Sequence, residues 1–402
     1  MSQAKKQDRI PSEPAAERVK ALLISGVYYP PQVGGISRFM EEVAAALGRD
    51  GACCLTGVAG NQNAGERAPR VYRFPSLIGR SRILKAAGWL TAALAIMIRE
   101  RPQIVILGSV DDSYFGLSLY RWFKIPFIVF AYGNEILETL SEGYERQQLA
   151  LGKARRVLAT SRYTAGIVEK AGADPRRIEI LSPGCDTNFF HPKAANEELR
   201  RKFLGQRENV RVILTVGNLV SRKGQDMVIR ALPQLLKSVP DLVYLIAGGG
   251  SYRGELEKLA TELGVLDRLV FAGRVPDEDL PDLYALCDVF VMVSRARLEA
   301  NDVEGFGMVL LEANACGKPV VGGRSGGVPD ALADGITGLL VDPLNPTEIA
   351  EAIERLLTDR DLAMRLGEQG RRRVLNDFQW SGVGARVKSV LEAVRHESGF
   401  SD

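Results

Sequence analysis

Short apolar segments alternate with helical or loop sequence along almost the whole chain, and this alternation limits the folds that the chain can adopt. The segments of the first half are VKALLISGVYYPP, IVILGS, PFIVFAYG, RRVLATS and IEILSPG. Those of the second half are RVILTVGNLV, LVYLIAGGG, LVFAGRV, DVFVMV and KPVVGG. Continuous apolar strands of this kind predict an α/β protein whose parallel sheets are covered by helices on both faces.

The length of the chain predicts two domains, because 402 residues exceed what a single hydrophobic core usually holds. The polar segment 191–209 separates the two halves and is the predicted linker. We expect one doubly wound domain over residues 16–195 and a second over 196–375, facing each other across a cleft at the carboxyl ends of their strands. Residues 1–15 are polar, and we expect them to be disordered.

Charge and cysteine content limit the partners and the compartment. The net charge of +3 is too small to predict a nucleic-acid partner. The five cysteines show no metal-ligand spacing and have apolar neighbours, so we expect reduced thiols in a cytoplasmic protein. The basic, acid-free stretch 70–85 leads into the apolar run 86–98, which is too short to span a bilayer. This run can be a helix that covers a sheet. It can also be a helix whose basic end contacts anionic lipid at the inner face of a membrane, and the two interpretations are compatible.

Two carboxylates flank a glycine-rich turn in the stretch DVEGFGMVLLEANACG. Glu304 precedes the turn, and Glu312 follows eight positions later in a predicted helix that ends at Gly317. The N–H groups of residues 306–309 are predicted to be unpaired at the helix start, where they attract phosphate. Carboxylates accept hydrogen bonds from hydroxyl groups such as those of sugars. The stretch therefore indicates a nucleotide-sugar site, and a surface helix with a solvated glutamate is the alternative.

The segment GNLVSRKGQD (217–226) places two cations after the first strand of the second half. Arg222 and Lys223 there could hold a diphosphate, and an exposed basic turn is the alternative. A long cation in this loop is not expected to be needed for packing. Glycines also fall at strand ends, where we interpret them as letting the backbone approach a ligand. They are Gly34, Gly35, Gly248, Gly249, Gly250, Gly322 and Gly323.

Together these motifs resemble those of the retaining glycosyltransferases of family 4, which have the two-domain GT-B fold. The resemblance rests on YYPPQVGGISRF, PGCDTNFFHP, GNLVSRKGQD, AGR and EGFGMVLLE, the last of which fits the Glu-x7-Glu pattern of that family. It extends from about Val19 to Trp380, and the phosphatidylinositol mannosyltransferases are the most similar subgroup. It implies that a C-terminal helix within 376–402 packs back on the first domain.

The resemblance also implies the roles of individual residues. Lys223 and Glu304 are the implied catalytic residues: the lysine binds the donor diphosphate, and the glutamate accepts hydrogen bonds from the donor sugar. Glu312 holds the ribose hydroxyls, and Gly35 lets the backbone approach the diphosphate. The remaining implied donor-binding residues are Asn218, Arg222, Arg274, Val275, Phe306, Gly307, Met308 and Val309.

Two positions depart from the pattern of the family. The segment AYGNEI has Tyr132 where many relatives have histidine, and GNLV has Asn218 where many have arginine. Asn218 can bond a phosphate but brings no charge, so we expect Arg222 to share that work. Tyr132 and Asn134 are the candidate residues on the acceptor side.

The activity implied by the resemblance is transfer of a hexose, with retention, from a nucleotide-diphosphate sugar to a hydroxyl of a glycan or lipid-linked acceptor. Mannose and GDP-mannose are favoured. The nucleotide sugar is a co-substrate, and we expect no cofactor and no essential metal, since the acids of VDDSYF (110–115) suit a helix N-cap better. Two alternatives remain open. One is another enzyme class on this fold, such as a nucleotide-sugar epimerase or a phosphorylase with pyridoxal phosphate, and the other is a non-catalytic donor-binding partner in a glycan assembly complex.

Overall fold

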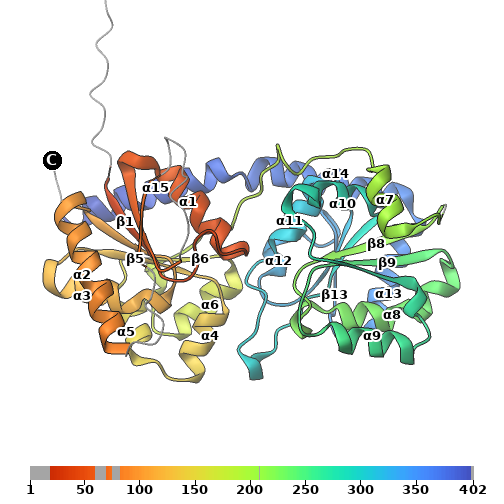
Figure 1. Ribbon diagram of the computed structural model, residues 1–402, viewed down its shortest axis with the longest axis horizontal. Helices are drawn as coiled ribbons and strands as arrows, with labels where there is room; N and C mark the ends of the chain where they lie inside the picture. Colours follow the sequence, from red (N-terminus) through yellow and green to blue (C-terminus); the bar gives the residue numbers. More distant parts are fainter. Residues whose placement is uncertain (1–18, 59–68, 75–81, 208, 400–402) are drawn as a thin grey trace, which may run out of the picture.

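The computed structural model describes residues 19–58, 69–74, 82–207 and 209–399. This part of the chain forms two lobes that lie side by side, each a parallel sheet with helices on both faces (Figure 1). The predicted fold class is confirmed. The segment predicted to be disordered, 1–15, lies outside the described residues.

The first lobe contains a seven-stranded sheet in the order β3-β2-β1-β4-β5-β6-β7, and all its neighbouring strands are parallel. The order reverses between β1 and β4, which creates a crevice at the carboxyl ends of these two strands. The strands are β1 (Ala21–Ser25), β2 (Ala52–Thr56), β3 (Arg70–Arg73), β4 (Ile104–Leu107), β5 (Phe127–Ala131), β6 (Arg156–Ala159) and β7 (Ile178–Ile180).

The second lobe repeats this arrangement with six parallel strands in the order β10-β9-β8-β11-β12-β13. Its order reverses between β8 and β11, so the loops that leave these two strands meet at one crevice. The strands are β8 (Arg211–Val216), β9 (Leu242–Ala247), β10 (Leu269–Gly273), β11 (Val289–Met292), β12 (Val320–Gly323) and β13 (Leu339–Val341).

The helices follow the strands in the alternating order that the sequence predicts. Those of the first lobe are α1 (Gly35–Gly51), α2 (Arg82–Glu100), α3 (Ser113–Phe123), α4 (Asn134–Ser141), α5 (Glu145–Lys153) and α6 (Arg162–Lys170). Those of the second lobe are α7 (Glu197–Leu204), α8 (Gln225–Ser238), α9 (Arg253–Glu262), α10 (Leu280–Leu286), α11 (Met308–Ala315), α12 (Val328–Ala331), α13 (Pro346–Thr358) and α14 (Arg360–Asp377). The last helix, α15 (Trp380–Glu397), returns to the first lobe.

Helix α15 completes the hydrophobic core of the first lobe. Its buried residues Val383, Val387 and Val390 join a cluster that includes Phe39 and Val43 of α1. The two helices approach closely, because a Cβ added at Gly384 would lie 2.5 Å from the Cβ of Ala46. The predicted return of the C-terminal helix is therefore confirmed.

Helix α2 covers the first sheet, as one of the two interpretations of the apolar run requires. Trp89, Ala93 and Ile96 are buried on the sheet, whereas Ile98 is 78% exposed. None of the described helices is both long enough and apolar enough to cross a membrane.

Three local features differ from the sequence predictions. The strands β2, β3 and β13 are not among the predicted strands. Strand β3 takes up the start of the basic stretch 70–85, of which residues 75–81 lie outside the described residues. The predicted linker 191–209 contains the helix α7, which Asn196 caps through its side chain. The carboxylate of Asp112 does not cap α3 but accepts a hydrogen bond from the N–H of Gly26, at 3.2 Å.

Candidate active site

The turn before α11 is built so that the start of that helix stays open. Gly307 has a φ of 97°, and a Cβ there would lie 2.9 Å from Leu310 Cδ1, so only glycine fits without strain. Phe306 is buried against Phe378 and anchors the turn. The first N–H groups of α11 have no partner within the helix, and such a helix start attracts an anion.

A glycine of the first lobe faces this helix start. Gly35 begins α1, and a Cβ added to it would lie 3.3 Å from the Sδ of Met308, the first residue of α11. The loops before α1 and α11 therefore meet, although they are more than 270 positions apart in sequence. The structure brings the predicted residues Gly35 and Met308 together at one place between the lobes.

The predicted catalytic pair, Lys223 and Glu304, is in direct contact. The Nζ of Lys223 lies 2.7 Å from Glu304 Oε2, and the two side chains are 12% and 13% exposed. The guanidinium of Arg222 bonds the same oxygen, and the hydroxyl of Ser294 lies 3.4 Å from it. Arg222 thus points inward, and both cations are largely buried and paired, so the alternative of an exposed basic turn is wrong.

The charges around Glu304 keep it ionised. Burial would raise the pKa of this carboxyl, but the positive charges of Lys223 and Arg222 outweigh burial and lower the pKa below its usual value. An ionised carboxylate accepts hydrogen bonds only, so it can bind hydroxyl groups of a ligand. The two cations are balanced by two carboxylates, because Arg222 also pairs with Asp302 at 2.7 Å.

Glu312 lies on the far side of the first turn of α11 from Glu304 and is in a different environment. It is 8% exposed, and its Oε2 accepts a hydrogen bond of 2.8 Å from the hydroxyl of Tyr284. Burial raises its pKa, and the Tyr284 hydrogen bond and the charge of Arg38 offset only part of that rise. The two acids therefore differ: Glu304 is held as an anion by cations, and Glu312 is a buried acceptor held by a tyrosine.

Comparison with known proteins identifies the family of this chain. Residues 196–373 match the family model described as glycosyl transferases group 1, and residues 33–189 match the model described as glycosyltransferase family 4. A GDP-mannose-dependent alpha-(1-6)-phosphatidylinositol monomannoside mannosyltransferase of Mycolicibacterium smegmatis is 43% identical over 380 residues, which cover 91% of this chain and 97% of the relative. The chain belongs to the group 1 glycosyltransferases. A protein of the same description from Mycobacterium tuberculosis is 33% identical over 90% of this chain and 96% of the relative.

Solved structures agree on the fold of this glycosyltransferase. The Anabaena protein HepE, crystallised with UDP and glucose, has a TM-score of 0.78 at 22% identity, over 94% of this chain and 100% of that chain. Sucrose-phosphate synthase from Thermosynechococcus elongatus has a TM-score of 0.80 at 22% identity, over 94% and 100%. The resemblance that the sequence motifs indicate is confirmed, and both solved structures share the two-lobed fold.

Three other predicted donor residues of the glycosyltransferase lie in the loops that follow β8 and β10. Asn218 and Arg274 are exposed, and Val275 is partly buried against the core of the second lobe. The side chain of Arg274 packs beside Gly249, whose added Cβ would lie 3.5 Å from Arg274 Cγ. Their roles stay predictions, as do those of Val309 and the other donor residues.

Three of the seven glycines at strand ends are required by packing within the protein. A Cβ at Gly248 would lie 1.9 Å from the carbonyl oxygen of Gly217, and one at Gly250 would lie 2.2 Å from that of Leu219. A Cβ at Gly323 would lie 2.3 Å from the carbonyl oxygen of Ser294. These glycines let neighbouring loops of the protein pack on one another, and the interpretation that they also admit a ligand stays a prediction.

The two acceptor-side candidates of the glycosyltransferase lie in different surroundings. Tyr132 is 6% exposed and packs against Tyr28 and Phe39, so it is part of the core of the first lobe. Its buried hydroxyl has no hydrogen-bond partner among the described residues. Asn134 is exposed to solvent and contacts the loop that carries Glu304.

Sequence reasoning missed several residues that shape the site. Ser294 and Tyr284 bind the two glutamates, and Asp302 binds Arg222. A signal for Asp302 exists in the sequence, since it stands two positions before Glu304, but its partner is 80 positions away. Among the described residues, no group of three or more histidine, cysteine or acidic side chains could hold a metal ion.

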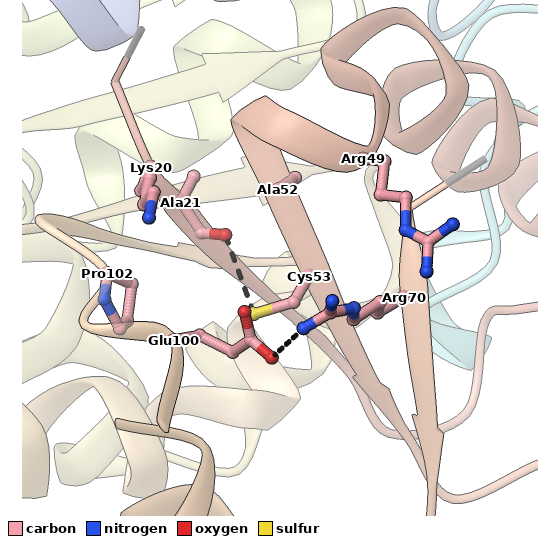
Figure 2. A pocket seen from close by; sticks show the side chains of 8 residues that line it. All are labelled: Lys20, Ala21, Arg49, Ala52, Cys53, Arg70, Glu100 and Pro102. Carbon is pink, nitrogen blue, oxygen red and sulfur yellow. Dashed lines mark hydrogen bonds and ion pairs between the residues drawn. The ribbon is translucent and has the colours of Figure 1, made fainter. Parts of the chain in front are cut away.

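A separate cavity lies at the amino ends of strands β1, β2 and β3 in the first sheet. Its volume is about 240 Å³, and Figure 2 shows that Glu100 points into it toward Arg70, with Cys53 alongside. Arg70 and Glu100 form an ion pair with each other, so the two charges balance within the cavity. Burial raises the pKa of the Cys53 thiol to about 12, so this cysteine is not a nucleophile near neutral pH. The donor residues lie at the carboxyl ends of the strands, away from this cavity.

Proposed function

We propose that this glycosyltransferase transfers mannose from GDP-mannose to a phosphatidylinositol mannoside. The observation that carries the proposal is the 43% identity, over 97% of its length, to a relative named as a GDP-mannose-dependent phosphatidylinositol monomannoside mannosyltransferase. A relative of similar name from Corynebacterium glutamicum, 31% identical over 91% of this chain and 96% of the relative, acts on a monoacylated form of that acceptor according to its name. The paired residues Lys223 and Glu304 support the same donor chemistry.

In the proposed complex the donor lies across the start of α11. The diphosphate accepts hydrogen bonds from the open N–H groups of that helix and from Lys223. Glu304, which two cations hold ionised despite its burial, accepts hydrogen bonds from the hydroxyls of the mannose. Glu312, in the second turn of α11, accepts hydrogen bonds from the ribose.

The transfer proceeds with retention and without a protein nucleophile. The bond between the anomeric carbon of mannose and the phosphate oxygen breaks, and its electron pair stays on that oxygen. The acceptor hydroxyl attacks from the same face, and its proton passes to the leaving phosphate, which gives GDP and the mannosylated lipid. Lys223, Arg222 and the α11 amides stabilise the negative charge that grows on the diphosphate, so the reaction needs neither a metal nor a cofactor.

We also propose that the enzyme contacts the inner face of a membrane, because the proposed acceptor is a lipid. The exposed Ile98 and the neighbouring Arg99, on the outer side of α2, support such a contact. Basic residues near anionic lipid contribute on the order of 1 kcal/mol each. The protein should sediment with anionic vesicles at low salt and be released as the salt concentration rises, and equal binding to neutral vesicles would contradict this part of the proposal.

The experiment that tests the function combines a donor panel with a defined acceptor. Purified protein is incubated with phosphatidylinositol monomannoside in detergent micelles and with GDP-mannose, GDP-glucose, UDP-glucose or UDP-galactose. We expect release of GDP and a lipid product heavier by one hexose with GDP-mannose only. Hydrolysis of the donor without a lipid product, or turnover of a UDP-sugar alone, would overturn the proposal.

A further inference from the structure

The two lobes contact each other at the loop that carries Glu304. The turn after β5 in the first lobe lies against residues 302–305 of the second lobe, so close that a Cβ at Gly305 would lie 2.1 Å from the carbonyl oxygen of Tyr132. A Cβ at Gly133 would likewise lie 3.0 Å from Val303 Cγ1. These positions show that the two backbones, not only side chains, are in contact.

Asn134 makes two hydrogen bonds across this contact. Its Oδ1 accepts a bond of 2.7 Å from the N–H of Val303, and its Nδ2 donates one of 3.2 Å to Asp302 Oδ1. A side-chain amide can donate and accept in this way at once, which a carboxylate cannot. Although solvent reaches Asn134, both ends of its amide are engaged with the second lobe.

The carboxylate that Asn134 contacts also orients the arginine of the donor site. The same Oδ1 of Asp302 accepts a bond of 2.7 Å from Arg222 Nε, while Nη1 of this arginine bonds Glu304. The backbone of Asp302 is held independently, because it exchanges two hydrogen bonds with the backbone of Arg297. Asn134 therefore fixes the direction of the Asp302 side chain and, through it, the angle of the Arg222 fork.

Asn134 is itself held firmly in the first lobe. It begins α4 immediately after Gly133, which has a φ of 141°. The buried carboxylate of Glu135 accepts hydrogen bonds from the N–H groups of Tyr132 and Gly133, at 2.6 and 3.1 Å. The backbone of Asn134 is thus fixed to its own lobe, so the side chain of Asn134 moves together with the first lobe.

We propose that Asn134 is a positioning residue that couples the first lobe to the donor sugar site, through Asp302, Arg222 and Glu304. The inference rests on the proposed function for the donor chemistry. It gives Asn134 a role other than the acceptor contact expected from the sequence. When the lobes are in register, Arg222 is held by Asp302 and leaves Glu304 oriented toward the donor sugar. When the lobes separate, Asp302 loses its hydrogen bond from Asn134, so Arg222 and the carboxylate of Glu304 are no longer held in one orientation.

The test compares Asn134→Ala with Ser141→Ala. The Ser141 hydroxyl accepts a bond of 2.7 Å from Asn301, so it is a second contact between the lobes that touches neither Arg222 nor Glu304. For each variant, calorimetry measures the affinities for GDP and for GDP-mannose, and kinetics give kcat and the KM of the acceptor. GDP lacks the sugar that Glu304 contacts and serves as the internal control.

We expect Asn134→Ala to weaken GDP-mannose binding and to lower kcat, each by about tenfold, which corresponds to about 1.4 kcal/mol. Its affinity for GDP, its acceptor KM and its melting temperature should stay within about twofold or a few degrees of the parent, and Ser141→Ala should resemble the parent throughout. Asn134→Asp, which places a second carboxylate beside Asp302, should be at least as impaired as Asn134→Ala.

A rise in acceptor KM alone would overturn the inference and make Asn134 an acceptor ligand. Equal effects of the two alanine variants would also overturn it, because any contact between the lobes would then suffice. Failure of the proposed function is separable from both outcomes. If the parent binds another nucleotide sugar in place of GDP-mannose, the same comparison is made with that sugar and its free nucleoside diphosphate.

Discussion

Replacing Gly305 by alanine tests whether the contact between the lobes sets the reaction geometry. The added Cβ would lie 2.1 Å from the carbonyl oxygen of Tyr132, and real Cβ atoms essentially never lie closer than 3.0 Å to such an atom. The backbones must therefore separate by about 0.9 Å at this point, directly beside Glu304. A misplacement of about 1 Å can lower the rate of a positioned reaction about 100-fold.

We expect kcat/KM of Gly305→Ala to fall by about 100-fold in the mannosyl-transfer assay. The melting temperature should change little, since the lobes can relieve the clash by moving apart and neither core is altered. The matched control is Gly166→Ala in α6, where an added Cβ meets nothing within 4 Å. Turnover of Gly305→Ala at the parental level would refute the reasoning, because the close approach of Tyr132 would then not belong to the reacting arrangement.

Three further substitutions test the site. Lys223→Met should lower turnover by about 10²–10³. It should reduce the free energy of unfolding by only about 1–3 kcal/mol, because Arg222 still pairs with Glu304. Turnover at the parental level would show that another cation binds the diphosphate. Asp112→Asn should remove part of the loss of stability with rising pH. Burial raises the pKa of Asp112 to about 8, above the usual value of 3.8 that applies to the unfolded chain. Between pH 3.8 and pH 8 the folded state therefore keeps a proton that the unfolded state has released. The free energy of unfolding falls over this range as the pH rises, by as much as about 1.4 kcal/mol per pH unit. Melting temperatures of parent and variant that stay parallel from pH 5 to pH 8 would contradict this. Tyr132→Phe removes a buried hydroxyl without a partner among the described residues, and it should leave turnover unchanged and stability equal or higher; a loss of turnover with an intact fold would assign that hydroxyl to the acceptor.

The apolar segments were sufficient to predict the fold, because all ten correspond to parallel strands, most of which are buried. The strands that escaped prediction have identifiable reasons. Segment 52–56 follows directly on α1, which ends at Gly51, so no loop sequence separates the two elements. Strand β3 is an edge strand whose polar residues give it no continuous apolar run, and β13 is an edge strand of only three residues. Local patterns also located the start of α11 and the two glutamates.

The contacts of the site could be predicted only in part. Lys223 and Glu304 were each expected near the donor, but their mutual bond joins residues 81 positions apart, and no local pattern encodes that distance. The same reason explains why Asp302 and Tyr284 were missed. The packing role of the glycines at strand ends could not be predicted, because the atoms that exclude a Cβ there belong to other loops, and a sequence does not show which loops are neighbours.

The return of α15 to the first lobe affects the order in which the protein can fold during synthesis. The first sheet is complete once β7 has been made, yet the cluster formed by Phe39, Met40 and Val43 lacks its covering helix until residues beyond 380 have left the ribosome. At about 5–20 residues per second, the roughly 200 intervening residues take about 10–40 s. During that interval the nascent first lobe exposes an apolar groove, which a chaperone that binds apolar surface can occupy. Loss of the last 20 residues should therefore destabilise the lobe that was made first and leave the later one folded.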